Sequence, residues 1–361
     1  MHQIFLVHGM GEFEAGWSAN IQEQIRRLLD SADYKELHAG GWSGNFEFKE
    51  IVYNDVFEDW RKQWRTDSAA ARQAITAAGL NDVAASRLLQ AADVTSGGGF
   101  WRTHVLDVVL YRYFMPVTEA VCTRIERQIL AHLQSFKPAP PSYTIIAHSL
   151  GSAAVYETLH AMLTGPGGLH PAYRPANLVM MANVTAALWN RGGSCYPSSM
   201  RPMLPDHLGS CYHFADFSHQ LDPFSNFRRF TPPDTWRQPP ARPDSFTQVE
   251  LAREDIQHVN VHALEHYLSH PAVHVPLLRL LTGYDDIISD AERDAAVARW
   301  RGARTPRVSA VAGDILDSLR ARAAKTFEEE IDVLLDFRTR VLQAAEAGTD
   351  PLLDGESGGA A

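Results

Sequence analysis

Cysteine is scarce in this sequence. Its 361 residues include only Cys122, Cys195 and Cys211, and no two of them have the C-x-x-C spacing of a redox or zinc motif. An odd number of widely spaced cysteines indicates neither a disulfide framework nor a structural zinc site. We therefore expect buried free thiols at all three positions, and we expect neither a metal ion nor an organic cofactor.

Blocks of one charge sign are also missing. The sequence has 33 Lys and Arg against 43 Asp and Glu, which gives a formal net charge of -10 at pH 7 with histidine counted as neutral. No segment concentrates lysine and arginine, whereas nucleic-acid-binding surfaces depend on clustered positive charge. Nucleic acid is therefore not an expected partner.

Nor does the sequence contain a long apolar run. A membrane-spanning helix needs about 18 or more apolar residues in succession, and the most apolar candidate, 105–117, contains Asp107 and Arg112. The first residues lack the charged segment and the cleavable apolar segment of a secretion signal. We expect a cytoplasmic protein without a transmembrane segment.

What is present is the pattern of an α/β protein. Hydrophobic residues make up 45% of the chain and charged residues 21%, as in ordinary globular proteins. Short β-branched apolar runs, which predict buried strands, alternate with segments of helical period. This alternation predicts a doubly wound, mostly parallel sheet, in which functional side chains gather at the carboxyl ends of the strands. Strands are expected at 3–7, 46–52, 143–146, 177–181, 211–217 and 249–261.

The predicted domain organisation has one insertion and one extension. We expect an α/β core at 1–54 and 116–282, a helical cap or lid at 55–115, further helices at 283–347 and a disordered tail at 348–361. The triple glycine at 97–99 lacks the Gly-Lys-Ser/Thr of a phosphate-binding loop, so a hinge is expected there. The aromatic segment that follows, 100–115, is either the inner face of a lid over an apolar pocket or part of the packed core.

The most informative stretch is 143–151, Tyr-Thr-Ile-Ile-Ala-His-Ser-Leu-Gly. Its first half predicts a buried strand, and a helix is expected immediately after one tight turn. Ala147 and Gly151 stand two positions before and two positions after Ser149, where a nucleophile elbow of the G-x-S-x-G type needs small residues. The segment 355–359 also matches this pattern, but no strand precedes it and no helix follows it. The alternative for Ser149 is a helix N-cap without a chemical role.

Three further candidate functional positions follow predicted strands. The loop 8–11, His-Gly-Met-Gly, comes directly after the first strand. Asp222 follows the fifth predicted strand, and His262 follows the last one. The order along the chain is therefore Ser149, Asp222, His262, which supplies a nucleophile, a carboxylate and a base.

Both the acid and the base have rivals. Asp216 competes with Asp222, which is preferred because a catalytic acid needs a loop position beyond the strand end. His266 competes with His262, which is preferred because it directly follows the predicted strand. Histidines also recur at every fourth position and would form a metal-binding stripe on one continuous helix, but the proline at 271 and the lack of H-E-x-x-H argue against that. These histidines are His258, His262, His266, His270 and His274.

With this elbow, this His-Gly turn and this order of Ser, Asp and His, the sequence resembles the α/β-hydrolase family of serine esterases and lipases. The resemblance covers about 3–281 as a strand and helix pattern, and only the elbow and the His-Gly turn are specific. It implies that the chain begins at the strand that comes third in the family. It also implies site roles: Ser149 as nucleophile, His262 as base, Asp222 as acid, the backbone amides of Met10 and Leu150 as the oxyanion hole, and His8, Gly9 and Gly11 as residues that shape the loop.

The resemblance implies a hydrolase that cleaves a carboxylic ester, small or lipid-like, through an acyl-enzyme intermediate. Two alternatives remain open. An acyltransferase or thioesterase would use the same triad, because the acceptor is chosen by pocket shape and water access. A catalytically silent scaffold would instead bind a partner protein through the long C-terminal helices.

Overall fold

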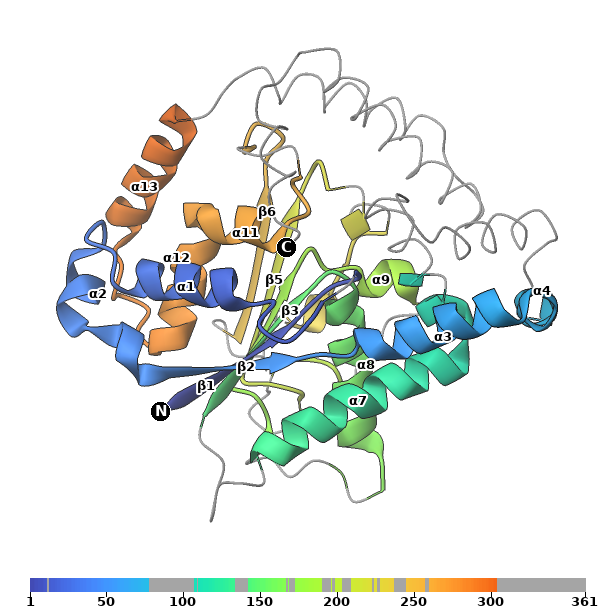
Figure 1. Ribbon diagram of the computed structural model, residues 1–361. Coiled ribbons are helices and arrows are strands. Elements are labelled where there is room, and N and C mark those ends of the chain that lie inside the picture. The colour runs from blue at the N-terminus through green and yellow to red at the C-terminus, as the bar shows by residue number, and fades with distance from the viewer. Residues whose placement is uncertain are drawn as a thin grey trace, which may run out of the picture. The chain divides into compact units, whose positions relative to one another are not determined.

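Six parallel strands form one sheet in the part of the chain that the computed structural model describes (Figure 1). The strands lie in the order β2-β1-β3-β4-β5-β6. The predicted α/β class with a parallel sheet is therefore confirmed. The bounds are β1 His2–Val7, β2 Phe46–Ile51, β3 Tyr143–His148, β4 Asn177–Met181, β5 His213–His219 and β6 Phe246–Leu251.

The structure describes most of the chain between residues 1 and 303. The triple glycine at 97–99, most of the loop 189–207 and the segment from 304 to the C-terminus lie outside the described residues, so the predicted hinge and tail do as well. The residues not described are 12, 78–106, 109, 134–141, 167, 169–172, 190–195, 197–198, 203–208, 223, 226–227, 237–244, 257–259 and 304–361.

The apolar runs form the middle of the sheet. Every residue of β4 is buried, and β1 and β3 are buried except for one end residue each. Strands that are covered on both faces require such continuous apolar sequence. β2 and β6 are the edge strands and carry a run of partly exposed residues between their ends.

The last strand ends earlier than the sequence pattern predicts. The prediction ran to residue 261, but β6 ends at Leu251. The Asp255 N–H donates to the Ala252 carbonyl at 2.9 Å, and the Ala252 N–H donates to Asp255 Oδ2 at 3.4 Å, so the chain turns there. Arg301 fixes the same carboxylate through two bonds of 2.7 and 2.8 Å. This turn overrides the β propensity of the residues that follow, and His262 lies in a loop rather than directly after a strand.

β1 and β3 mark the point where the sheet changes its direction of growth. The chain adds β2 on one side of β1 and then crosses over to add β3 on the other side. The register pairs Val7 with Ala147, so the two strands end level with each other. Ligands bind at such a switch point in open α/β sheets. The loop 8–11 and the turn at Ser149 both begin there.

Contacts divide the chain into two compact units. Unit 1 comprises Met1–Ala19, Asn45–Ala215 and Arg229–Thr247, and unit 2 comprises Asn20–Gly44, Asp216–Arg228 and Gln248–Ala361. The described helices of unit 1 are α3 Asn54–Thr66, α4 Ser68–Ala77, α7 Met115–Leu133, α8 Leu150–Thr164 and α9 Thr185–Leu188. Those of unit 2 are α1 Ala19–Leu29, which starts at the boundary, α2 Lys35–Gly40, α11 Leu264–Ser269, α12 Pro271–Thr282 and α13 Asp290–Gly302. A short 3-10 helix at Trp42–Asn45 lies at the end of the first segment of unit 2, and another at Asp234–Trp236 lies in unit 1.

In unit 1, α7 and α8 pack against each other and against the sheet (Figure 1). α8 contacts β1 and β3, and α7 contacts β2. The buried side chains of α7 recur at every fourth position, which is the spacing of one helix face. They are Val117, Val121, Ile125, Ile129 and Leu133.

The described parts of the predicted cap at 55–115 are helical, and helix packing and one buried ion pair join them. α3 packs on α4 and α7. Arg61 on α3 forms a buried ion pair with Asp107, with Nη1 and Oδ1 2.6 Å apart. Because both groups are withdrawn from water, either would be costly to leave without the other.

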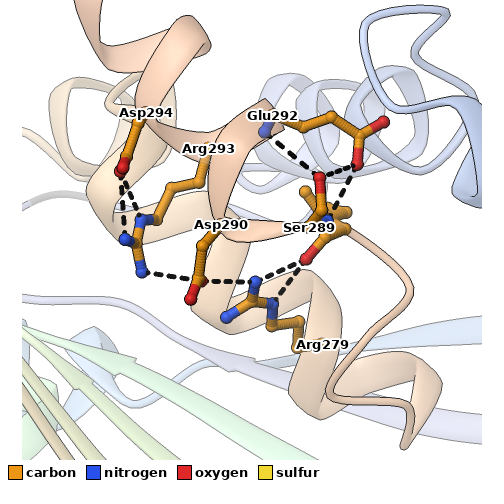
Figure 2. A network of polar contacts seen from close by, with 7 residues as sticks. Arg279, Ser289, Asp290, Glu292, Arg293 and Asp294 are labelled. Carbon is orange, nitrogen blue, oxygen red and sulfur yellow. Dashed lines mark hydrogen bonds and ion pairs between the residues drawn. The ribbon is translucent and has the colours of Figure 1, made fainter.

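In unit 2, polar contacts join α12 to α13 (Figure 2). Ser289 Oγ accepts the Glu292 N–H at 3.2 Å, and Glu292 Oε2 accepts the Ser289 N–H at 2.8 Å, which forms a capping box. Arg279 of α12 donates to Asp290 Oδ1 at 3.0 Å, and Arg293 pairs with the same carboxylate at 3.1 Å. The start of α13 is thereby fixed to the end of α12.

Two sequence expectations concern membranes and thiols. None of the helices in the described part of the chain is both long and apolar enough to cross a membrane. Cys211 is a buried free thiol, and Cys122 is a half-buried one. Cys195 lies outside the described residues.

Candidate active site

Ser149 occupies the turn between β3 and α8 in a strained backbone conformation. Its φ is 53° and its ψ is -125°, a region that non-glycine residues rarely adopt and that costs on the order of 1–3 kcal/mol. The residue stands at the N-cap position of α8, yet its side chain makes no capping hydrogen bond. The usual reason for a serine at this position of a helix is therefore missing.

The small residues around Ser149 are explained by close packing. A Cβ added at Gly151 would lie 2.2 Å from the His8 carbonyl oxygen, so only glycine fits there. A Cβ added at Gly9 would lie 2.8 Å from Ser149 Cβ and 3.3 Å from its Oγ. The loop after β1 therefore lies directly against the serine.

A second serine ties the elbow to the loop after β4. Ser152 Oγ donates to the Ser149 carbonyl at 2.6 Å and accepts the Val184 N–H at 3.2 Å. The Ser149 N–H donates to the Met181 carbonyl at 3.0 Å. Ala182, which follows Met181, is buried and has a φ of 51°. Two strained residues thus lie close together, as is common at functional sites.

His8 is held as a neutral imidazole. Its Nδ1 donates to the Gly9 carbonyl at 2.7 Å, and its Nε2 accepts the Tyr53 N–H at 3.3 Å. Its ring stacks on Phe13 at 4.4 Å and on Tyr53 at 4.2 Å. Burial lowers the pKa of His8 to about 4, although the Gly9 hydrogen bond and the charge of Glu50 act in the opposite direction. At neutral pH this histidine shapes its loop.

The rest of this loop is fixed by Glu50 at the end of β2. Glu50 accepts hydrogen bonds from the Gly16 N–H at 2.7 Å, the Ser18 N–H at 2.9 Å and the Ser18 hydroxyl at 2.7 Å. Burial alone would raise the pKa of Glu50, but these donors outweigh it and the pKa is lowered. The carboxylate therefore stays ionised and keeps its three donors.

The amides expected to form an oxyanion hole belong to Met10 and Leu150, the residues that follow Gly9 and Ser149 in the chain. Leu150 is the first residue of α8, and the N–H groups of a first helical turn have no carbonyl partner within the helix. Met10 follows Gly9, and both Met10 and Leu150 are buried. Gly11 has a φ of 130°, which a residue with a side chain would adopt only with strain.

In unit 2, His262 and Asp222 form a buried hydrogen-bonded pair. His262 Nδ1 lies 3.0 Å from Asp222 Oδ1 and 2.9 Å from Oδ2. The same carboxylate accepts the Phe224 N–H at 3.0 Å and the Tyr267 hydroxyl at 3.0 Å. Burial alone would raise the pKa of Asp222, but His262 and these donors outweigh it and the pKa is lowered. The arrangement orients the imidazole and keeps the carboxylate ionised.

The two rivals take part in other contacts. Asp216 lies inside β5, and its Oδ2 accepts a hydrogen bond from Gln248 Nε2 at 2.9 Å. His266 lies on α11 and packs against His219 and Trp300. His258 lies outside the described residues, and the described residues contain no group of three or more His, Cys, Asp and Glu side chains that could hold a metal ion.

Sequence reasoning missed two tyrosines that hold these groups. The Tyr53 hydroxyl shares its one proton between the carbonyls of His8 and Gly9, and the Tyr267 hydroxyl donates to Asp222. Tyr53 stands just beyond the end of an edge strand, which was an available signal in a parallel sheet. No spacing rule marks Tyr267.

His274 repeats the arrangement of His8 in unit 2. Its Nδ1 donates to the Leu268 carbonyl at 2.9 Å, and its Nε2 lies 2.5 Å from the Tyr34 hydroxyl, which donates to it. Burial lowers the pKa of His274 to about 4. Both His8 and His274 are thus buried in the neutral form.

These two histidines predict acid destabilisation. Their pKa values of about 4 in the folded protein lie below the value of about 6.5 in an unfolded chain. As the pH falls from 6.5 towards 4, the unfolded state takes up protons first, so the free energy of unfolding falls by up to about 1.4 kcal/mol per pH unit for each histidine. Urea denaturation between pH 7 and 4.5 measures this slope, and His274→Gln should reduce it. A free energy of unfolding that is flat over this range contradicts the account.

The described residues include the parts that acyl transfer requires. Unit 1 has a serine on a strained turn, with the amides of Met10 and Leu150 following Gly9 and Ser149, and unit 2 has a histidine oriented by a carboxylate. No metal or cofactor is needed for this chemistry. Comparisons of the chain with protein-family models, with curated proteins and with solved structures found no match. The function is therefore inferred from the residues themselves.

Proposed function

We propose that this protein is a serine hydrolase of the α/β-hydrolase kind that cleaves a carboxylic ester through Ser149, His262 and Asp222. The observation that carries the proposal is the strained turn at Ser149, where the serine has a φ of 53° and lies against Gly9. Strain at a buried residue persists only where the surrounding structure imposes it, and it is common where chemistry needs it.

The proposed reaction begins with the proton of Ser149 Oγ. His262 Nε2 accepts this proton while Oγ attacks the ester carbonyl carbon, and the carbonyl oxygen becomes an oxyanion bound by the N–H groups of Met10 and Leu150. Collapse of the tetrahedral intermediate breaks the bond to the alcohol, which leaves with the proton from His262. Water then attacks the acyl-enzyme by the same route and releases the acid.

The pair formed by Asp222 and His262 supports the assignment of the base. A carboxylate that accepts a hydrogen bond from the Nδ1–H favours the tautomer in which Nε2 carries no proton and can act as a base. Ser149 follows β3 and Asp222 follows β5, and functional residues of parallel sheets gather beyond the carboxyl ends of the strands. The chain order Ser, Asp, His is that of α/β-hydrolases.

The test is a rapid-mixing assay with p-nitrophenyl esters from acetate to long acyl chains. An acyl-enzyme predicts an initial release of p-nitrophenol that matches the enzyme concentration, followed by slower steady turnover. Transfer of the acyl group to an added alcohol in preference to water would indicate an acyltransferase, and faster cleavage of thioesters would indicate a thioesterase. A folded protein that releases nothing from any ester or thioester would contradict the proposal and favour a silent scaffold.

The carboxylate assignment has a test of its own. Asp222→Asn keeps the shape of the side chain but favours the wrong tautomer of His262, so kcat should fall by about 10⁴-fold. Asp216→Asn is the matched control and should lower stability more than turnover. Ester turnover of the two folded variants decides which of the two carboxylates is the catalytic acid. An active Asp222→Asn beside an inactive Asp216→Asn would show that the acid is assigned wrongly.

A further inference from the structure

The peptide bond between Gly9 and Met10 is held from one side. Its carbonyl oxygen, on Gly9, accepts the His8 Nδ1–H at 2.7 Å and the Tyr53 hydroxyl at 3.1 Å. The carbonyl and the N–H of a trans peptide point in opposite directions. The Met10 N–H therefore points away from the His8 ring and from the Tyr53 hydroxyl.

The residues on either side do not fix the orientation of the Gly9–Met10 peptide plane. Met10 lies between Gly9 and Gly11, and glycine allows rotations that other residues resist. A half-turn of the peptide would replace the Met10 N–H by the Gly9 carbonyl, and the site would present an acceptor where an oxyanion needs a donor. Side-chain contacts must therefore hold the peptide in one orientation.

Tyr53 is suited to provide such a contact. It is fully buried beyond the end of β2, and its ring stacks on His8 with an interplanar angle of 15°. Its N–H donates to His8 Nε2, and its single hydroxyl proton is shared between the Gly9 carbonyl and the His8 carbonyl, which lies 2.7 Å away. Burial raises the pKa of Tyr53 well above 10, with further increases from Asp107 and Cys122, so the hydroxyl remains a donor.

We propose that Tyr53 is a positioning residue whose hydroxyl holds the Gly9 carbonyl and thereby keeps the Met10 N–H directed for oxyanion binding before substrate arrives. The inference rests on the proposed function, because an oxyanion forms only if Ser149 attacks a carbonyl group. Tyr53 acts through Gly9 and His8 and has no step of its own in the reaction.

Tyr53→Phe tests this role, because it removes the hydroxyl and keeps the ring that stacks on His8. Loss of one oxyanion-hole donor costs about 10²–10³ in kcat. A donor that is loosened rather than removed costs less, so we expect kcat to fall about 10- to 100-fold. KM should change by no more than about twofold, because ground-state binding does not depend on the oxyanion.

Tyr143→Phe is the matched control. Tyr143 is also buried, and its hydroxyl donates to the Tyr173 carbonyl at 2.5 Å, but it stands at the opposite end of β3 from Ser149. Both variants lose one buried hydroxyl that binds main-chain carbonyl, so both should lower the thermal midpoint by similar amounts. Only Tyr53→Phe should lower kcat. Equal losses of kcat in the two variants would overturn the proposal.

Inhibitor binding distinguishes a positioning role of Tyr53 from a general disruption of the pocket in Tyr53→Phe. A trifluoromethyl ketone forms a tetrahedral adduct with an oxyanion, so its affinity should weaken in Tyr53→Phe by the same factor as kcat/KM. The affinity of the product alcohol, which carries no negatively charged oxygen, should stay unchanged. If both ligands weaken equally, Tyr53 only maintains the pocket, and the positioning role is wrong.

A further readout does not depend on catalysis. With ¹⁵N-methionine labelling, the Met10 amide signal, assigned through Met10→Leu, should broaden or exchange faster in Tyr53→Phe and not in Tyr143→Phe. If wild-type protein turns over no ester, the proposed function fails, and this signal still decides whether Tyr53 holds the peptide. An unchanged Met10 signal in Tyr53→Phe overturns the inference even if ester turnover is confirmed.

Discussion

Replacing Ser149 with alanine is expected to lower kcat by about a million-fold, as removal of a triad nucleophile does in serine proteases. The protein should remain folded, because alanine has the same Cβ and the side chain of Ser149 makes no capping bond that α8 would lose. Ester turnover with saturating substrate, measured beside the thermal midpoint, checks both parts of this expectation.

Ser357→Ala is the matched control for this variant. Ser357 is the central residue of the second G-x-S-x-G match, 355–359, so the two substitutions compare the same pattern with and without the sequence of a predicted strand before it. Ser357→Ala should retain wild-type turnover. Unaltered turnover in Ser149→Ala would contradict the central assignment whatever the control does.

His262→Ala should have an effect of similar size, about a million-fold in kcat, because a serine hydroxyl without its base is a weak nucleophile. His266→Ala is the control, since His266 is also buried but packs against His219 and Trp300. It should lower stability and retain most of the turnover. The two variants are compared at a temperature at which both are folded.

The opposite pattern would assign the base to His266. In that case the hydrogen bonds between His262 and Asp222 would serve stability alone. Addition of a chelator to the wild-type enzyme completes the comparison, because the proposed chemistry uses no metal. Loss of turnover with the chelator would revive the interpretation of the histidines as metal ligands.

The strand, turn and helix around Ser149 could be predicted because their determinants are adjacent in sequence. A β-branched run, a serine between small residues and a helix with a small first turn all lie within 143–160. The structure adds the reason for the small residues, which is the close approach of the loop 8–11 to Ser149 and Gly151. That contact joins segments about 140 residues apart, and only the chain's path through the sheet brings them together.

The end of the last strand could not be predicted from β propensity. Val259 and Val261 favoured a strand that reached His262, but the turn at Asp255 ends β6 at Leu251. The partner that fixes Asp255 is Arg301, which lies on α13. A local pattern cannot reveal a turn that depends on so distant an ion pair.

Contacts between residues far apart in the sequence also explain why the roles of Tyr53 and Tyr267 in the candidate site could not be predicted. Tyr53 bonds to the His8 carbonyl 45 residues earlier, and Tyr267 bonds to Asp222 45 residues earlier. Aromatic residues in apolar segments most often fill the core, so the sequence does not show that these two hydroxyls bind site residues, although Tyr53 follows directly after a predicted strand. Their hydroxyl partners became visible only with the fold.

Labelling with a fluorophosphonate, followed by peptide mapping, tests the central claim most directly. The reagent forms a stable phosphonyl ester with a serine that is activated by a base. The account predicts one adduct per chain, located on Ser149, which is absent in Ser149→Ala and in His262→Ala and retained in Ser357→Ala. An adduct on another serine, or no adduct on the folded wild-type protein, would contradict it.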